Sequence, residues 1–173
     1  MSLSLHDVII PAYRQVVGSV QGVLKKGADH YNVDGRSPDD LLSARICETM
    51  YPLTFQLHSV AHHTIGSVNG VLAGEFGPPS NLETLDYAGF QAKLAETDAA
   101  LAAVDADAFN ACAGKDVVFR IGDRALPFTA EGFLLSFSKP NVYFHATTAY
   151  DLLRMKGVPI GKLDFLGRMQ LKG

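Results

Sequence analysis

Apolar residues recur every three or four positions over much of this chain, and that spacing gathers them on one face of a helix. The first such stretch runs from residue 4 to about residue 30. Ser4, with Asp7 three residues later, resembles a capping box. Pro11 lies inside the stretch, so we expect a kink or a late helix start there. The pattern predicts a long first helix whose apolar stripe consists of Ile9, Tyr13, Val16, Val20 and Val23.

A second helix is predicted to begin at Ser37. The Ser-Pro-Asp-Asp sequence supplies a cap, a proline suited to the first helical position and acidic residues suited to the positive end of the helix dipole. We expect the helix to run to about Ala73, with a kink at Pro52. Gly74 and the segment 77–79, Gly-Pro-Pro, end the pattern.

A third helix is predicted over residues 85–104, where the apolar positions alternate at spacings of three and four, as in the seam of a helix bundle. These positions are Tyr87, Phe90, Leu94, Thr97, Leu101 and Val104. Residues 105–109 follow as a short helical turn.

The pattern then changes from helical spacing to a run of β-branched and apolar residues. Residues 117–121 and 125–128 flank Gly122 and Asp123, which predicts a short β-hairpin. Pro127 has no backbone N–H to give to a neighbouring strand, so its strand should lie at the edge of a sheet.

Thr129 is suited to cap a last helix, and Glu131 to its first turn. Pro140 is expected to kink this segment or split it into residues 130–138 and 141–156, and Gly157 to end it. The second half is apolar nearly all round, which is typical of a central, buried helix. The chain therefore reads as an all-α protein, a single helical-bundle domain over residues 1–173 with one short β-hairpin before the last helix.

Asn141 and His145 are polar residues one turn apart on this apolar helix. A buried polar pair must be hydrogen-bonded, bound to a metal or part of a pocket wall. One turn is also the spacing at which two helix side chains can meet one ion. A second interpretation stays open, in which His145 is a hydrogen-bonded core histidine and Asn141 a cap after the break at Pro140.

His58 and His62 have the same one-turn spacing, with His63 beside them. A projection at about 100° per residue places His58 and His62 away from the apolar stripe of their helix. They share this second face of the helix with Phe55 and Ile65. An apolar second face usually meets another element or another subunit. We therefore favour an interface or a plain surface over a native metal site here. Gln56 flanks the stripe on the edge that His63 also borders, and it could reach an inward cavity.

Composition and charge narrow the classes of function. The net charge is −3 and the longest basic run is Lys25-Lys26, which argues against nucleic-acid binding. No apolar run reaches the ~20 residues of a membrane span. The first residues lack the features of a signal peptide, and the two cysteines, Cys47 and Cys112, lie far apart, so we expect a cytoplasmic protein. Common hydrolase, zinc-protease, phosphate-loop and dinucleotide-binding motifs are missing from the sequence.

Three segments of the sequence resemble one known family, the family called domain of unknown function 1993. They are NVYFHATTAYDLLRMKGVPIGKLDFLG at residues 141–167, LLSARICETMYPLTFQ at 41–56 and PFTAEGFLLSFSKPN at 127–141. That family is similar to the DinB/YfiT-like superfamily of four-helix bundles, many of which are classed as metalloenzymes. Some of these relatives are transferases that use low-molecular-weight thiols. The resemblance implies the same bundle here.

The resemblance also implies a site. The superfamily pattern has one histidine on the second helix and an HxxxH pair on the fourth. His145 matches the second histidine of that pair, Asn141 matches the first, and Gln56 falls close to the helix-two ligand. Gln56, Asn141 and His145 are therefore the predicted metal-ligand positions, for zinc or nickel. Because amide oxygens are poor ligands for these metals beside imidazole, tight metal binding is in doubt while a polar pocket is still expected.

Three hypotheses about function follow. The protein could be a metal- or thiol-dependent transferase in which His145 binds a metal or acts as a catalytic base. It could instead be a non-catalytic small-molecule-binding or stress-associated module that has lost the metal, with Tyr143 or Tyr150 also in the pocket. It could also be a dimer scaffold, since the His58/His62 face and the last helix offer surface to a partner. We predict a homodimer, with no nucleic-acid or membrane partner.

Overall fold

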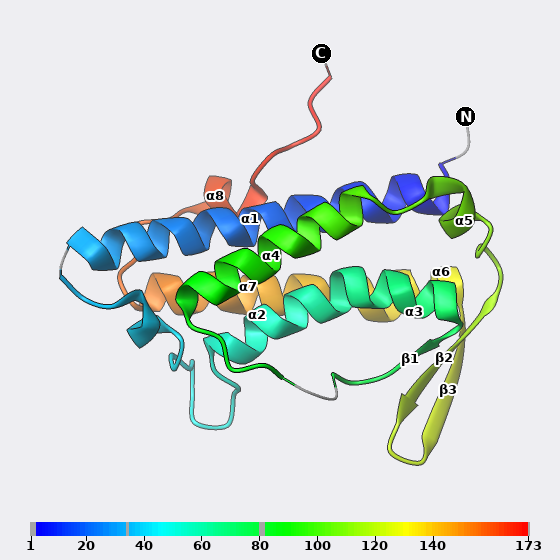
Figure 1. The fold of residues 1–173 in the computed structure, drawn as a ribbon, viewed down its shortest axis with the longest axis horizontal. Coiled ribbons are helices and arrows are strands. Elements are labelled where there is room, and N and C mark those ends of the chain that lie inside the picture. Colours follow the sequence, from blue (N-terminus) through cyan, green and yellow to red (C-terminus); the bar gives the residue numbers. More distant parts are fainter. Residues whose placement is uncertain (1–2, 34, 80–81, 173) are drawn as a thin grey trace.

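The computed structural model describes residues 3–33, 35–79 and 82–172, and the chain is mostly helical with a small sheet (Figure 1). The helices are α1 (Leu5–Val33), α2 (Leu53–Ala61), α3 (Ser67–Ala73), α4 (Tyr87–Ala102), α5 (Ala106–Asn110), α6 (Ala130–Phe133), α7 (Lys139–Met155) and α8 (Lys162–Leu166). None of the helices in the described part is both long and apolar enough to cross a bilayer.

The long helices lie in two layers (Figure 1). Helices α1 and α4 pack on one another in one layer, and α2 packs on α7 in the other. Helix α1 also contacts α7, which closes the core. The predicted stripes face inward, because the members of the α1 and α4 stripes up to Leu101 are all buried. At the crossing of α1 and α4, the Tyr87 hydroxyl donates to the Leu24 carbonyl at 2.8 Å. Gly27 makes room for this hydroxyl, since a Cβ there would lie 2.5 Å from it.

The start of α1 agrees with the predicted capping box. The Asp7 carboxylate accepts from the Ser4 backbone N–H at 3.2 Å, and the Ser4 Oγ accepts from the Asp7 N–H at the same distance. The expectation of a late start at Pro11 was wrong, because the helix begins at Leu5. A proline so near the start removes only one backbone hydrogen bond from a helix of 29 residues, and packing on the core outweighs that loss.

The second predicted helix is broken. Ser37 does cap a helical turn by accepting from the Asp39 N–H, but that turn is a 3-10 helix that ends at residue 41 (Pro38–Leu41). Residues 43–52 form no helix, and Pro52 precedes α2 instead of kinking it. Proline disfavours helical geometry in the residue before it. The loop closes on itself through a 3.0 Å hydrogen bond from the Leu53 N–H to the Ala44 carbonyl.

Two π-helical turns lie in the layer formed by α2 and α7, which we call the inner layer. One (His62–Gly66) joins α2 to α3, and the other (Leu134–Ser138) joins α6 to α7. The second replaces the split that we expected at Pro140, since that proline sits in the first turn of α7 and the helical path continues. The turns meet at Ser138, whose hydroxyl donates to the His63 carbonyl at 2.6 Å. Gly157, with φ of 87°, ends α7 as predicted.

The predicted hairpin is present as β2 (Asp116–Ile121) and β3 (Arg124–Thr129), paired antiparallel. A short strand that the sequence analysis missed, β1 (Glu75–Phe76), pairs parallel with β2, so the strand order is β1-β2-β3. Pro127 lies on β3, which is an edge strand as expected. Gly74, with φ of 79°, lets the chain turn directly from α3 into β1.

The C-terminal helix α8 lies along α1 (Figure 1). The Gln15 side-chain amide donates to the Leu166 carbonyl at 2.8 Å, and the Ser19 hydroxyl bonds to the Phe165 carbonyl. The Lys26 ammonium pairs with the Asp164 carboxylate at 2.6 Å. The tail of the quoted C-terminal segment therefore fastens the chain to the outer face of α1.

Candidate functional site

The structure brings two of the three predicted site residues into direct contact between α2 and α7. The Gln56 side-chain oxygen Oε1 lies 2.8 Å from Nδ1 of His145, and both side chains are buried. The Gln56 Nε2 donates to the Tyr51 carbonyl at 3.0 Å, which fixes the orientation of the amide. Since Oε1 can only accept, Nδ1 of His145 carries the proton. Its Nε2 therefore holds a free lone pair.

The free Nε2 of His145 is not fully buried. It has no hydrogen-bond partner in the described part of the chain. It is also absent from the buried side-chain nitrogens and oxygens that lack a partner there, among which only His63 Nδ1 is found. Hence His145 presents one unoccupied hydrogen-bond acceptor at the edge of an otherwise buried side chain.

The third predicted residue, Asn141, lies one turn before His145 on α7 and is half-buried. Its Nδ2 donates to the Phe137 carbonyl at 2.7 Å, four residues back along the helix. Within residues 3–33, 35–79 and 82–172, no hydrogen bond joins Asn141 to Gln56 or His145. The amide oxygen of Asn141 has no hydrogen-bond partner among these residues.

His63 is the residue of this site that the sequence analysis did not select. Its ring stacks nearly parallel to that of His145, at 12° and with 5.7 Å between centroids. Its Nδ1 is buried without a partner. His63 lies seven residues after Gln56, about two helical turns, and so falls on nearly the same face. The sequence therefore placed Gln56 and His63 on the same edge of the stripe, but the contact of His63 with His145 joins two different helices and has no signal in the spacing.

Aromatic rings surround the histidine pair. Phe55 and Phe144 contact the His145 ring edge-on, at 5.9 and 5.2 Å between centroids. Phe76 and Phe137 lie against His63, both at 5.8 Å. Burial in this apolar shell lowers the pKa of His145 to about 4. Burial, with smaller contributions from His62 and His145, lowers the pKa of His63 to about 3. Both imidazoles are therefore neutral at pH 7.

This set of donors does not fit a tight zinc or nickel centre. The described residues hold no group of three His, Cys, Asp or Glu side chains placed to share a metal ion. Structural and catalytic zinc sites usually take at least three such ligands. The Gln56 oxygen is already engaged with His145, and Asn141 offers only an amide oxygen. We derive no chemical step that passes through a metal.

His58 and His62 lie on a different face of the same helix. The described parts of the segment between β1 and α4 cover them. His58 is only 6% exposed, so it does not lie on the plain surface that we considered. Its Nε2 lies 2.9 Å from the Glu83 carbonyl, and the His62 Nε2 lies 2.8 Å from the Gly77 carbonyl. The second apolar face of this helix thus meets another element of the same chain.

Comparison with known proteins assigns the class and the family. The fold is similar to that of a DinB family member protein from Shewanella denitrificans in a crystal structure, with a TM-score of 0.81 at 22% identity. The match covers 98% of this chain and 95% of the other. The protein thus has a DinB-like fold.

A sequence model of the family "Domain of unknown function (DUF1993)" matches residues 5–166. The chain belongs to this family, which confirms the resemblance seen in its sequence. No curated protein was found to match the chain.

Proposed function

We propose that this protein is a small-molecule-binding module in which Nε2 of His145 accepts a hydrogen bond from the ligand. The observation that carries this proposal is the 2.8 Å contact between Gln56 Oε1 and His145 Nδ1, which leaves Nε2 free in a fixed orientation. The amide oxygen of Asn141 and the rings of Phe55 and Phe144 supply the adjoining polar and apolar contacts. Such a site suits a small molecule with an N–H, O–H or S–H donor and an apolar body.

The low pKa of His145 favours binding over catalysis by proton abstraction. An effective catalytic base has a pKa near the working pH, whereas that of His145 is lowered to about 4 by burial. A thiol has a pKa of about 8.5, so an imidazole this weak would remove its proton poorly. A neutral imidazole is, by contrast, an effective hydrogen-bond acceptor at pH 7.

A metal- or thiol-dependent transferase is the second candidate. It is supported by the DinB-like fold and by His63, which adds a second imidazole beside His145. In this alternative the two histidines would be ligands, and the paired helices α2–α3 and α6–α7, with α1 and α4, would form the four-helix bundle of the superfamily. The weakness of the donor set makes it the second choice.

Metal analysis separates the two candidates. We expect tag-free protein, purified without nickel resin, to contain far less than one zinc or nickel per chain by plasma mass spectrometry. His145→Ala should not change that content. Near-stoichiometric metal that is lost in His145→Ala would replace our proposal with the transferase, as would strong activity in a thiol-transfer screen that His145→Ala abolishes.

We also propose that the protein forms a homodimer. Tyr143, Phe144 and Met155 are large apolar side chains on α7 that are 41–59% exposed, and a second copy could cover them. A strictly monomeric mass by light scattering at high concentration would contradict this.

A further inference from the structure

A cavity of about 380 Å³ lies on another face of the inner layer, between α2, its π turn and α4. His58 and His62 line it from one side, and Lys93, Glu96 and Thr97 from the other. A second cavity of about 500 Å³ adjoins it and shares His58. These volumes lie in the range of natural small-molecule sites. Neither cavity is lined by Gln56, Asn141 or His145, so this place is separate from the site described above.

The hydrogen bonds of His58 and His62 fix their tautomers. Each Nε2 faces a backbone carbonyl, that of Glu83 or of Gly77, and a carbonyl can only accept. Each Nε2 therefore carries the proton and each Nδ1 a free lone pair. Neither Nδ1 has a partner in the described part of the chain, and neither is sealed from solvent. Two side chains one helical turn apart that line this cavity thus each carry an imidazole acceptor that is not fully buried.

The other polar groups of the cavity also favour a donor. The Thr97 hydroxyl donates its hydrogen to the Lys93 carbonyl at 2.8 Å, so it can only accept a hydrogen bond from a ligand. The Glu96 carboxylate is exposed and has no ion pair or hydrogen bond among the described residues. The Lys93 ammonium pairs with the Glu83 carboxylate at 3.0 Å, which offsets its charge. The charge left at the cavity is that of Glu96.

We propose that this cavity binds a small organic ammonium compound. Its N–H groups would meet the carboxylate of Glu96 and the Nδ1 atoms of His58 and His62, which all accept. Its apolar body would pack on Ala61, Ile65 and the other apolar lining residues. A carboxylate ligand of the same shape would find Glu96 repelling it and only Lys93 to bind. Among the described residues, Glu96, His58 and His62 are not placed to share one metal ion.

The test uses n-butylammonium chloride as the probe and sodium n-butyrate as its oppositely charged counterpart. Full-length protein with ¹⁵N-labelled histidine is titrated at pH 7.5, and the Nδ1 and Nε2 resonances are followed by long-range ¹H–¹⁵N NMR. We expect saturable binding of butylammonium, with a Kd on the order of 1 mM for so small a ligand. The Nδ1 signals of His58 and His62 should shift, and butyrate should shift neither.

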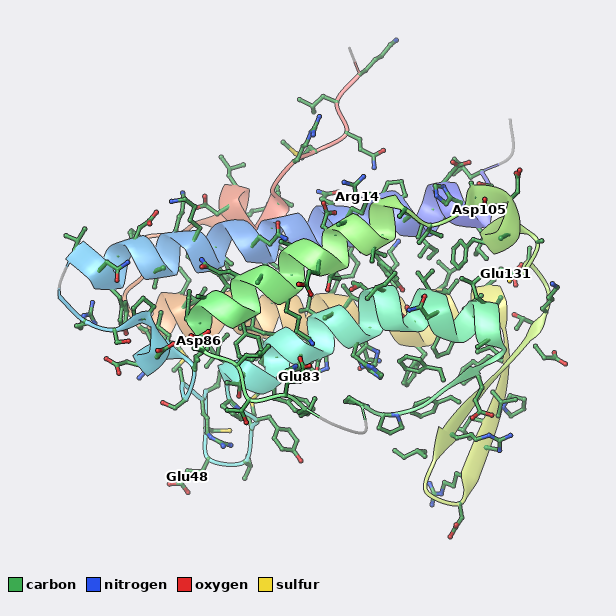
Figure 2. All side chains as sticks on the ribbon, in the orientation of Figure 1. Arg14, Glu48, Glu83, Asp86, Asp105 and Glu131 are labelled. Atoms are coloured by element: carbon green, nitrogen blue, oxygen red, sulfur yellow. The ribbon has the colours of Figure 1, made fainter. Side chains whose placement is uncertain are left out.

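Glu96→Gln is the decisive variant, because it removes the charge and keeps the shape. The loss of one charge-assisted hydrogen bond should raise the Kd about tenfold. Glu48→Gln makes the same change in net charge. Glu48 lies on the loop before α2 (Figure 2) and lines neither cavity, so this variant should leave the Kd unchanged. Glu96 is exposed on α4, so its replacement should not impair folding.

The outcomes decide between the two sites. If butylammonium does not saturate, or if Glu96→Gln and Glu48→Gln weaken it equally, the proposal is overturned. Shifts confined to His145 and His63 would also overturn it, since the probe would then occupy the other site. Binding that persists in His145→Ala would support the cavity independently of the function proposed for His145.

Discussion

At the scale of single residues, the hydrogen bond between Gln56 and His145 decides what the site can do. One amide oxygen selects the tautomer of a buried imidazole and leaves its second nitrogen open. Metal-site histidines are commonly oriented by such a partner on their other nitrogen. Here the orienting group is Gln56, which lies close to the position that the superfamily resemblance predicts for the metal ligand of the second helix.

Gln56→Leu should destabilise the protein by about 1–3 kcal/mol, because it leaves the Nδ1–H of His145 and the Tyr51 carbonyl without partners. It should also release the tautomer, which would appear in ¹⁵N NMR as a mixture of protonated Nδ1 and Nε2. Unfolding in urea gives the change in free energy. Gln91→Leu on α4 is the matched control, since Gln91 has no hydrogen bond from its side chain in the described part of the chain. Equal effects of the two substitutions would contradict our account.

The sequence supported part of this site. His145 was selected because a histidine on a nearly all-apolar helix needs a partner, and Gln56 because the superfamily resemblance placed it close to the helix-two ligand position. The partnership between them depends on how α2 sits against α7, which periodicity does not determine. His63 was passed over because its stacking on His145 is a contact between helices that are 82 residues apart in the chain.

At the scale of elements, the two π turns are the feature that ties the inner layer together. The Ser138 hydroxyl donates to the His63 carbonyl at 2.6 Å, so the Tyr13 hydroxyl, 2.7 Å away, must donate to Ser138. Burial raises the pKa of Tyr13 to about 12, so it keeps its proton. This chain of hydrogen bonds links α1 and both π turns. A π turn frees backbone carbonyls from the regular ladder, and here one of them is used between helices.

Ser138→Ala should cost about 1–3 kcal/mol of stability, because it leaves the buried Tyr13 hydroxyl without its acceptor. Ser136→Ala is the control, since Ser136 is exposed and, among the described residues, bonds only to the Gly132 carbonyl of its own helical segment. Thermal and urea unfolding of both variants give the comparison. A Ser138→Ala protein as stable as Ser136→Ala would show that the link contributes nothing.

The elements that the sequence did not predict share a physical cause. Residues 43–52 carry helix-forming side chains, yet a proline at 52 and the return of the chain onto Ala44 override that preference. Strand β1 is only two residues long and exists because β2 lies beside it. The hairpin of β2 and β3 was predictable, because its turn and its β-branched residues are local signals.

At the scale of the whole molecule, the inner layer buries neutral histidines, and this links stability to pH. His63 and His145 have pKa values of about 3 and 4 in the folded protein. Those of unfolded histidine lie near 6.5. Burial also lowers the pKa of His58 and His62. Between these limits the unfolded chain binds more protons than the folded one, so the free energy of unfolding must fall as the pH falls through about 6.5.

The expected size of this effect can be stated for each histidine. Consider a histidine whose pKa is about 6.5 in the unfolded chain and about 4 or below in the folded protein. Its free energy contribution lowers the stability at pH 5 by about 2 kcal/mol relative to pH 7.5, so His63 and His145 together lower it by up to about 4 kcal/mol. Urea unfolding between pH 7.5 and 5 measures it, in a range above that where most carboxylates titrate. His63→Leu should reduce the loss by about 2 kcal/mol, because it removes one proton acceptor of the unfolded chain. Gln91→Leu, which removes no titratable group, should leave the pH dependence unchanged. A free energy of unfolding that stays constant over this range would contradict this account, because it would mean that the folded protein takes up as many protons as the unfolded chain and does not keep these imidazoles neutral down to pH 5.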